Sequence, residues 1–235
     1  MRRLLGQTFL VLVILFYSCA VFSKEAKRAA TTFRLDSLGG LEIINIKAEM
    51  AEYRGRRAVH LLRREGQDPG TNDQTGESLA ILNGTDFKDG TIEAEVAGMP
   101  AAGAPPDARG FIGIAFRVAG HGTKFECFYL RPTNGRAEDQ LRRNHSVQYI
   151  SSPDYSWKKL RTENPGVYES YADMEAGAWT KIKIEVAGTK ANLYVNGAEQ
   201  PCLIVNDLKL GDSRGQIALW TTAETDGYFS NLTVQ

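Results

Sequence analysis

The chain has 235 residues, of which 43% are hydrophobic and 24% charged, and these values exclude disordered and fibrous classes. Its 28 basic and 28 acidic side chains give a formal net charge of zero. Nucleic acid is therefore not an expected partner, because phosphate binding needs a basic excess.

Residues 1–23 have the features of an export signal. Arg2 and Arg3 precede an apolar run over 4–17, and small side chains follow it. This run is shorter than the roughly 20 residues of a membrane-spanning helix. Cys19 after Ser18 leaves open a lipoprotein signal, in which the thiol carries a lipid anchor. We expect a secreted or periplasmic protein with no membrane span, or alternatively an outer-surface lipoprotein, with residues 24–32 as a short tether.

From residue 33 onward the dominant hydrophobic period is two, which is typical of strands. In 90–96, for example, Ile92, Ala94 and Val96 alternate with polar side chains. No segment has a sustained helical stripe, so the pattern predicts an all-β sandwich of about twelve strands, in one domain over 33–235. The expected strands are 41–46, 56–63, 78–83, 90–96, 110–118, 124–131, 146–151, 179–186, 191–197, 202–206, 215–221 and 227–234.

Two segments interrupt this rhythm. Residues 98–109 form a Gly-, Ala- and Pro-rich loop, and residues 132–178 form a longer insertion with one obvious strand. A segment of that length inside a domain is usually functional or disordered. The insertion is rich in arginine side chains and in aromatic rings, and because disordered segments lack such rings, it is where we expect function.

The strands 110–118 and 124–131 suggest a ligand-binding face. Their alternation places small side chains, one tyrosine and two arginines on the face opposite the core stripe. Such a face offers room, a ring for stacking and donors for ligand oxygens. With the neighbouring insertion, the expected ligand contacts are Arg117, Tyr129, Arg131, Asn134, Arg136, Arg142, Asn144, Gln148, Tyr149, Trp157 and Trp220.

The sequence lacks the residue patterns that several kinds of catalytic or metal site require. Glu93 and Glu95 are the nearest match to the carboxylate pair of a glucanase, but a third acid is missing and their face is expected to be exposed. The histidines and cysteines show no zinc-ligand spacing, and no cofactor is expected. The segment 68–74 is rich in oxygen donors, so either a plain polar loop or a Ca²⁺ loop is compatible with it. Cys127 and Cys202 are compatible with a disulfide or with two free thiols.

Six motifs resemble the concanavalin A-like lectin/glucanase superfamily, especially its laminin-G-like and keto-disaccharide hydrolase-like jelly rolls in secreted bacterial proteins. These motifs are 87–93, 110–117, 179–183, 194–197, 215–220 and 228–232. The resemblance implies two curved antiparallel sheets with a carbohydrate-type ligand on the concave one. Arg117, Tyr129 and Arg131 would then lie on that surface, and 132–178 would form its rim.

Three functions remain open at this stage. The first is a secreted sugar-binding or sugar-processing jelly roll, in which Asp139, His145 and Arg143 are the candidate catalytic residues if there is turnover. The second is an enzyme similar to keto-disaccharide hydrolases, which act by elimination beside a carbonyl and need no carboxylate pair. The third is a non-catalytic module that recognises a protein. The oligomeric state is left undetermined.

Overall fold

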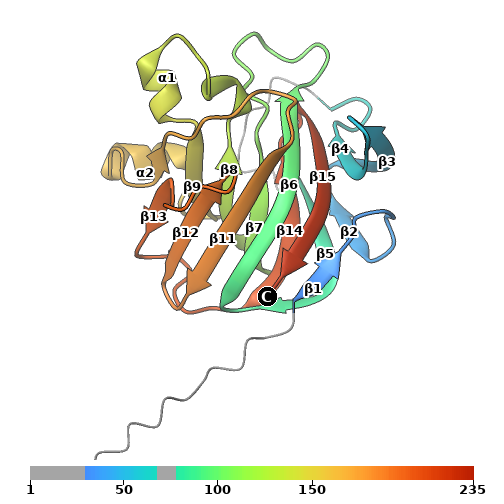
Figure 1. Cartoon of the computed structure of the whole chain (residues 1–235). Helices are drawn as coiled ribbons and strands as arrows, with labels where there is room; N and C mark the ends of the chain where they lie inside the picture. Colours follow the sequence, from blue (N-terminus) through green and yellow to red (C-terminus); the bar gives the residue numbers. More distant parts are fainter. Residues whose placement is uncertain (1–29, 68–77) are drawn as a thin grey trace, which may run out of the picture.

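Two antiparallel sheets face each other in the computed structural model, which describes residues 30–67 and 78–235 (Figure 1). The front sheet of Figure 1 has eight strands, and its path is β13 (Leu203–Val205), β12 (Lys190–Val195), β11 (Thr180–Ala187), β6 (Gly90–Pro100), β15 (Thr225–Val234), β4 (Arg56–Leu62) and β3 (Lys47–Tyr53), with β1 (Thr31–Phe33) paired to β15. The rear sheet has seven strands in the order β10 (Glu169–Ser170), β9 (Val147–Ser152), β8 (Lys124–Leu130), β7 (Ile112–Ala119), β14 (Gly215–Thr221), β5 (Ser78–Phe87) and β2 (Leu41–Ile44). The predicted all-β sandwich is confirmed.

The main core lies between the two sheets. In β11, Ile182, Ile184 and Val186 are buried while Lys183 and Glu185 between them are half-buried, as the period of two requires. Ile114 of β7 and Phe128 of β8 reach the same core from the other sheet. Each of the twelve strands expected from alternation is present, with shifted ends.

A second hydrophobic cluster lies on the face of the seven-stranded sheet that points away from the other sheet. It contains large aromatic side chains, and Tyr129 and Trp220 pack at 4.9 Å between ring centroids. Its buried members are Leu79, Ile81, Phe111, Ala115, Val118, Phe125, Cys127, Tyr129, Ile150, Ala218 and Trp220. Both faces of this sheet are therefore largely apolar and buried.

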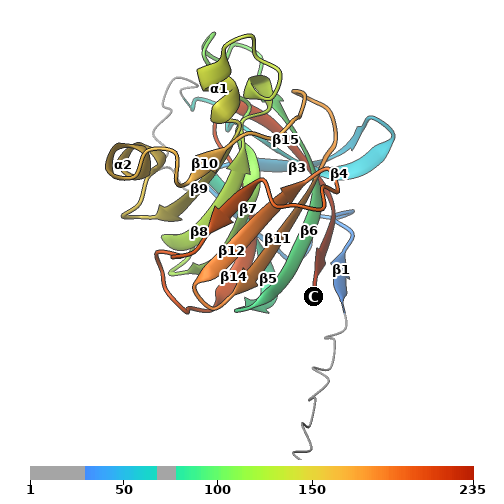
Figure 2. The same cartoon turned by 60° about the vertical axis from the view of Figure 1, so that its left-hand side comes forward.

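The only helices among the described residues interrupt the chain between β8 and β10. They are η1 (Pro132–Asn134), α1 (Gln140–Asn144) and α2 (Trp157–Glu163). Figure 2 shows α1 and α2 beside β8, β9 and β10, so the insertion predicted over 132–178 supplies β9 and β10 at one edge of the sheet and the helices next to them. Within 30–67 and 78–235, no helix has the length and apolarity to cross a bilayer.

Two sequence predictions concern residues outside the described ranges, and a third concerns the cysteines. The export signal over 1–23 and the oxygen-rich segment 68–74 lie outside the described residues. Cys127 and Cys202 are both free, and burial raises the pKa of Cys202 to about 11. The structure therefore answers the open question of the disulfide in favour of two thiols.

Candidate functional site

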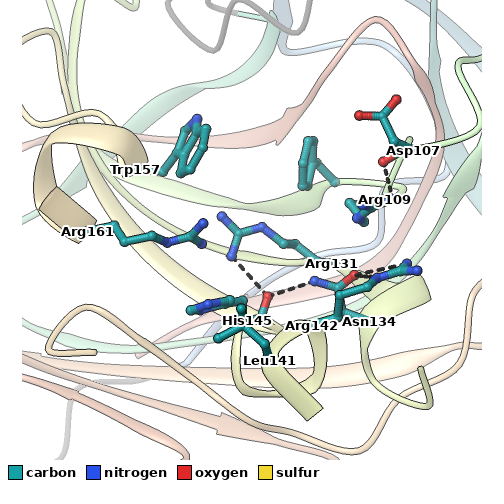
Figure 3. Close-up of a pocket in the computed structure, with 10 residues that line it drawn as sticks. Asp107, Arg109, Arg131, Asn134, Leu141, Arg142, His145, Trp157 and Arg161 are labelled. Atoms are coloured by element: carbon teal, nitrogen blue, oxygen red, sulfur yellow. Dashed lines mark hydrogen bonds between the residues drawn. The ribbon is translucent and has the colours of Figure 1, made fainter. Parts of the chain in front are cut away.

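A cavity of about 310 Å³ lies where β8 ends and β7 begins, next to the inserted helices (Figure 3). Four of its ten lining side chains are arginines, and two are aromatic rings. We call it the arginine pocket. Its lining residues are Asp107, Arg109, Phe111, Arg131, Asn134, Leu141, Arg142, His145, Trp157 and Arg161.

The loop between β6 and β7 and the insertion over 132–178 supply nine of these ten residues. The loop between β6 and β7 contributes Asp107, Arg109 and Phe111, whereas the remaining six follow Arg131 in the insertion. The scaffold strands therefore hold the pocket at one end, and their connections furnish its chemistry. This arrangement is common for binding sites built on a rigid sheet.

Local sequence signals explain how the two helices present their side chains. Asp139 caps α1 by accepting the backbone N–H of Arg142 at 3.0 Å. In α2, Ser156 accepts the N–H of Lys159, and Leu160 is the buried anchor of the helix. Trp157 and Arg161 are four residues apart, so they share one face of α2, with the guanidinium 4.7 Å from the ring centroid.

Arg131 forms the inner wall of the pocket. Its side chain is 6% exposed, and its guanidinium donates to the Tyr129 hydroxyl at 2.8 Å, the Gln148 Oε1 at 3.0 Å and the His145 carbonyl at 3.0 Å. Burial raises the pKa of Tyr129 to about 12, which keeps this hydroxyl protonated. Arg131 is thus a buried cation that three hydrogen bonds hold in place.

Glu169 of β10 lies behind the pocket and is shared between cations. Arg161 donates to both of its carboxylate oxygens at 2.6–3.0 Å, and Arg131 Nη1 is 3.9 Å away. His145 Nδ1 lies 2.8 Å from Glu169 Oε2 but outside hydrogen-bond geometry. Burial lowers the pKa of His145, the charges of Arg161 and Arg131 lower it further, and Glu169 opposes them.

Two further guanidinium groups face the pocket with few partners. Arg142 donates only to Asn134 Oδ1, in two long contacts of 3.4 Å, and Arg109 donates to the carbonyls of Asp107 and Ala108 in its own loop. Among the residues that the structure describes, no carboxylate lies within 4.0 Å of either guanidinium. Their remaining N–H groups are free to bind a ligand.

The structure brings five of the predicted site residues together in the pocket. They are Arg131, Asn134, Arg142, His145 and Trp157. Asp107, Arg109, Phe111, Leu141 and Arg161 were not predicted. Of these, Arg161 had a usable signal, because its spacing of four from Trp157 places both side chains on one face of a short helix.

Arg117 requires a correction. It is fully buried near the opposite end of β7, where its guanidinium donates to the carbonyls of Lys88, Gly188 and Gly211 at 2.6–3.1 Å. The backbone has a φ of +55° at this position, and the β7–β8 register shifts between Phe116 and Ala119. This β-bulge re-aims the side chain, so we assign Arg117 a structural role in place of ligand binding.

Four other predicted contacts are buried inside the protein and do not line the pocket. Tyr129 and Trp220 belong to the second hydrophobic cluster, and Tyr149 to the main core. Gln148 is fully buried and donates to the carbonyls of Tyr149 and Tyr168 at 3.0 and 3.1 Å. The predicted open face is thus filled by its own side chains, and of these four residues Tyr129 and Gln148 hydrogen-bond to Arg131 of the pocket.

The remaining predicted residues lie near the pocket but outside its lining. Asp139 is the α1 cap, and Arg143 donates to the Tyr171 hydroxyl at 3.0 Å. Arg136 pairs with Asp173 and Glu175 on the surface, and Asn144 accepts from Gln140 at 2.8 Å. His145 is therefore the one predicted catalytic residue that lines the cavity.

The chain matches no family model, and no curated protein matches its sequence. Solved structures do match. One is a carbohydrate-binding module, CBM66, from Bacillus subtilis, with 13% identity, a TM-score of 0.51 and coverage of 83% of this chain and 98% of that one. Another is a protein of unknown function with a galectin-like fold from Bacillus subtilis, with 13% identity, a TM-score of 0.55 and coverage of 89% and 97%.

A third similar structure is the Crh5 transglycosylase in complex with NAG, with 10% identity, a TM-score of 0.51 and coverage of 88% and 84%. These matches confirm the concanavalin A-like jelly-roll fold that the motifs predict. At such low identity they show the fold alone. The closer resemblance to keto-disaccharide hydrolases stays a prediction.

Proposed function

We propose that this chain binds a carbohydrate in the arginine pocket. The observation that carries the proposal is the lining itself: guanidinium and amide donors from separate elements surround a cavity that is also lined by the rings of Phe111 and Trp157. Sugar hydroxyls need several fixed donors, and the apolar face of a pyranose packs against aromatic rings. Three hydrogen bonds fix Arg131, so it presents a preorganised wall to the ligand.

The structural neighbours support the same class of ligand. One is a carbohydrate-binding module, and another is a transglycosylase whose structure contains NAG. We extend only the ligand class to this chain, because a shared fold hosts different functions. An extracellular or periplasmic setting fits this role and depends on the export signal expected over 1–23.

Titration calorimetry with mono- and oligosaccharides of several classes tests the proposal. Trp157→Ala should weaken binding of a recognised sugar about tenfold, or about 1.4 kcal/mol. The matched control is Tyr171→Ala, because Tyr171 is an exposed ring of the same insertion that does not line the pocket. Thermal melts of both variants check folding.

Absence of heat with every sugar class at millimolar concentration would refute carbohydrate binding. Equal losses in the two variants would refute the location of the site. If a protein from the native extract binds in place of sugars, the protein-recognition hypothesis replaces this one.

A specific observation favours a second candidate, turnover of keto-glycosides. His145 lines the pocket, and the lowered pKa of its imidazole keeps it neutral and able to accept a proton near pH 7. In a 3-keto-glycoside, a base removes the C2 proton beside the carbonyl. A C1–C2 double bond then forms as the glycosidic oxygen leaves with its bonding electrons and takes up a proton.

In this scheme Arg142 stabilises the enolate oxygen, because its guanidinium has unused donors at the same cavity. Incubation with 3-keto-glycosides should release the leaving sugar, and His145→Gln should abolish that release while sugar binding persists. Unchanged turnover in His145→Gln would eliminate the histidine as the base.

A further inference from the structure

The arginine pocket has more positive charge than its own acids offset. Four arginines line it, and Asp107 is the one carboxylate among the lining residues. Building on the proposed carbohydrate binding, we propose that the recognised saccharide carries an oxyanion, a carboxylate or a sulfate, held by Arg142 and Arg109.

The positive charge of the two inner arginines, Arg131 and Arg161, is already partly neutralised. Glu169 is bidentate to Arg161 and 3.9 Å from Arg131, so one buried carboxylate serves two guanidinium groups. The donors of Arg131 that the structure accounts for go to neutral oxygens. This pair therefore retains about one positive charge while being rigidly held. His145 adds no charge near neutral pH, because its pKa is lowered.

The outer pair, Arg142 and Arg109, has no such partner among the described residues. The contacts of Arg142 to Asn134 are long, and those of Arg109 are to carbonyls in its own loop. Burial lowers the pKa of Arg109, and the positive charges of Arg142 and Arg131 lower it further. Arginines whose positive charges crowd one cavity are the surroundings in which an anion replaces repulsion with attraction.

The nearby acids do not cancel this excess. Figure 3 shows the Asp107 carboxylate at the edge of the group, pointing away from Arg131, Arg142 and Arg161. Glu224 is buried, and burial and the charge of Asp107 raise its pKa, which weakens its ionised form. A guanidinium binds a carboxylate or sulfate through two parallel N–H···O bonds, whereas a neutral hydroxyl uses only one.

The experiment compares three probes that share one sugar backbone type: oligogalacturonate, the same oligosaccharide with its carboxyl groups reduced, and a sulfated galactan oligosaccharide. Calorimetry at low salt should show that at least one anionic probe binds ten or more times tighter than the reduced one. Arg142→Met should remove that advantage, so that the variant binds the charged and the reduced probe with similar affinity. The affinity of the anionic probe should also fall as NaCl is raised.

The matched control is Lys158→Met, which removes an exposed positive charge of α2 outside the pocket. It should retain the preference for the anionic probe. Tighter binding of the uronate or of the sulfated probe identifies which oxyanion is recognised. Equal affinity for charged and reduced probes overturns the anion but upholds carbohydrate binding, and no binding of any probe or of neutral sugars overturns both. Equal losses in Arg142→Met and Lys158→Met indicate nonspecific attraction and overturn the assignment to the pocket.

Discussion

Replacing Arg117 with methionine tests whether this buried cation holds the far end of the sandwich together. The substitution keeps an unbranched apolar stem and removes all the donors. Three carbonyl oxygens, those of Lys88, Gly188 and Gly211, then lose their hydrogen bonds, and the 3.3 Å contact to Asp89 is lost as well.

The magnitude follows from those acceptors. Each buried acceptor left unpaired costs about 1–3 kcal/mol, and water reaching the turns from outside keeps each cost near the lower end. The half-exposed Asp89 pair adds less than about 1 kcal/mol. We therefore expect Arg117→Met to lower the free energy of unfolding by about 3–5 kcal/mol. For a domain of this size, that corresponds to a fall in Tm of about 6–20 °C.

Urea unfolding followed by tryptophan fluorescence measures the change. Arg214→Met is the control, because Arg214 also pairs with an acid, Asp86 at 2.6 Å, yet is 52% exposed and should cost less than about 1 kcal/mol. Ligand binding by the folded Arg117 variant should be unchanged, since Arg117 lies at the other end of β7 from the pocket. A loss of stability no larger than that of the control, or a selective loss of binding, would refute the structural role.

Three further predictions concern groups away from the pocket. Burial raises the pKa of Glu126, so the folded state holds this proton more tightly, and the group's contribution to the free energy of unfolding falls as the pH rises above the ordinary value of 4.5. Glu126→Gln should remove this pH dependence in unfolding series at different pH, and an equal pH dependence in both proteins would contradict the prediction. Gly113→Ala should lower the free energy of unfolding, measured in denaturant, by about 1–3 kcal/mol, because a Cβ there would lie 2.7 Å from the Cα of Tyr129. An unchanged free energy of unfolding would mean that β7 and β8 can move apart without cost. Peptide mapping after alkylation without reductant should find Cys127 and Cys202 both modified in the unfolded protein and Cys127 protected in the native one, whereas resistance of both when unfolded would indicate a disulfide.

The strands could be predicted from the sequence because burial between two sheets imposes a period of two. The missed strands are those where this pressure is weak: β1 and β10 are only two or three residues long, and β3 has mostly half-buried side chains. Helix α2 was missed because it buries a single residue, Leu160, and so has no apolar stripe.

The location of the arginine pocket and five of its ten lining residues could be predicted. Insertion 132–178 stood out by length and by its rings and arginines, and it supplies six lining residues. Strict alternation failed at Arg117, because a bulge shifts the register: Ile114 and Phe116 before it lie in the main core, but Val118 after it belongs to the second hydrophobic cluster. The sequence also does not reveal that Tyr129 and Trp220 pack against each other and fill the face expected to be open.

The pairing of β1 with the last strand has a consequence for how the pocket is displayed. Thr31 is opposite Val234, so both ends of the described chain leave the sandwich side by side, far from α1 in Figure 1. A carrier domain, a bead or a cell surface joined at either end would therefore lie at the end of the sandwich opposite α1, and the arginine pocket would face away from it. Immobilising this protein through either end should therefore leave the arginine pocket accessible.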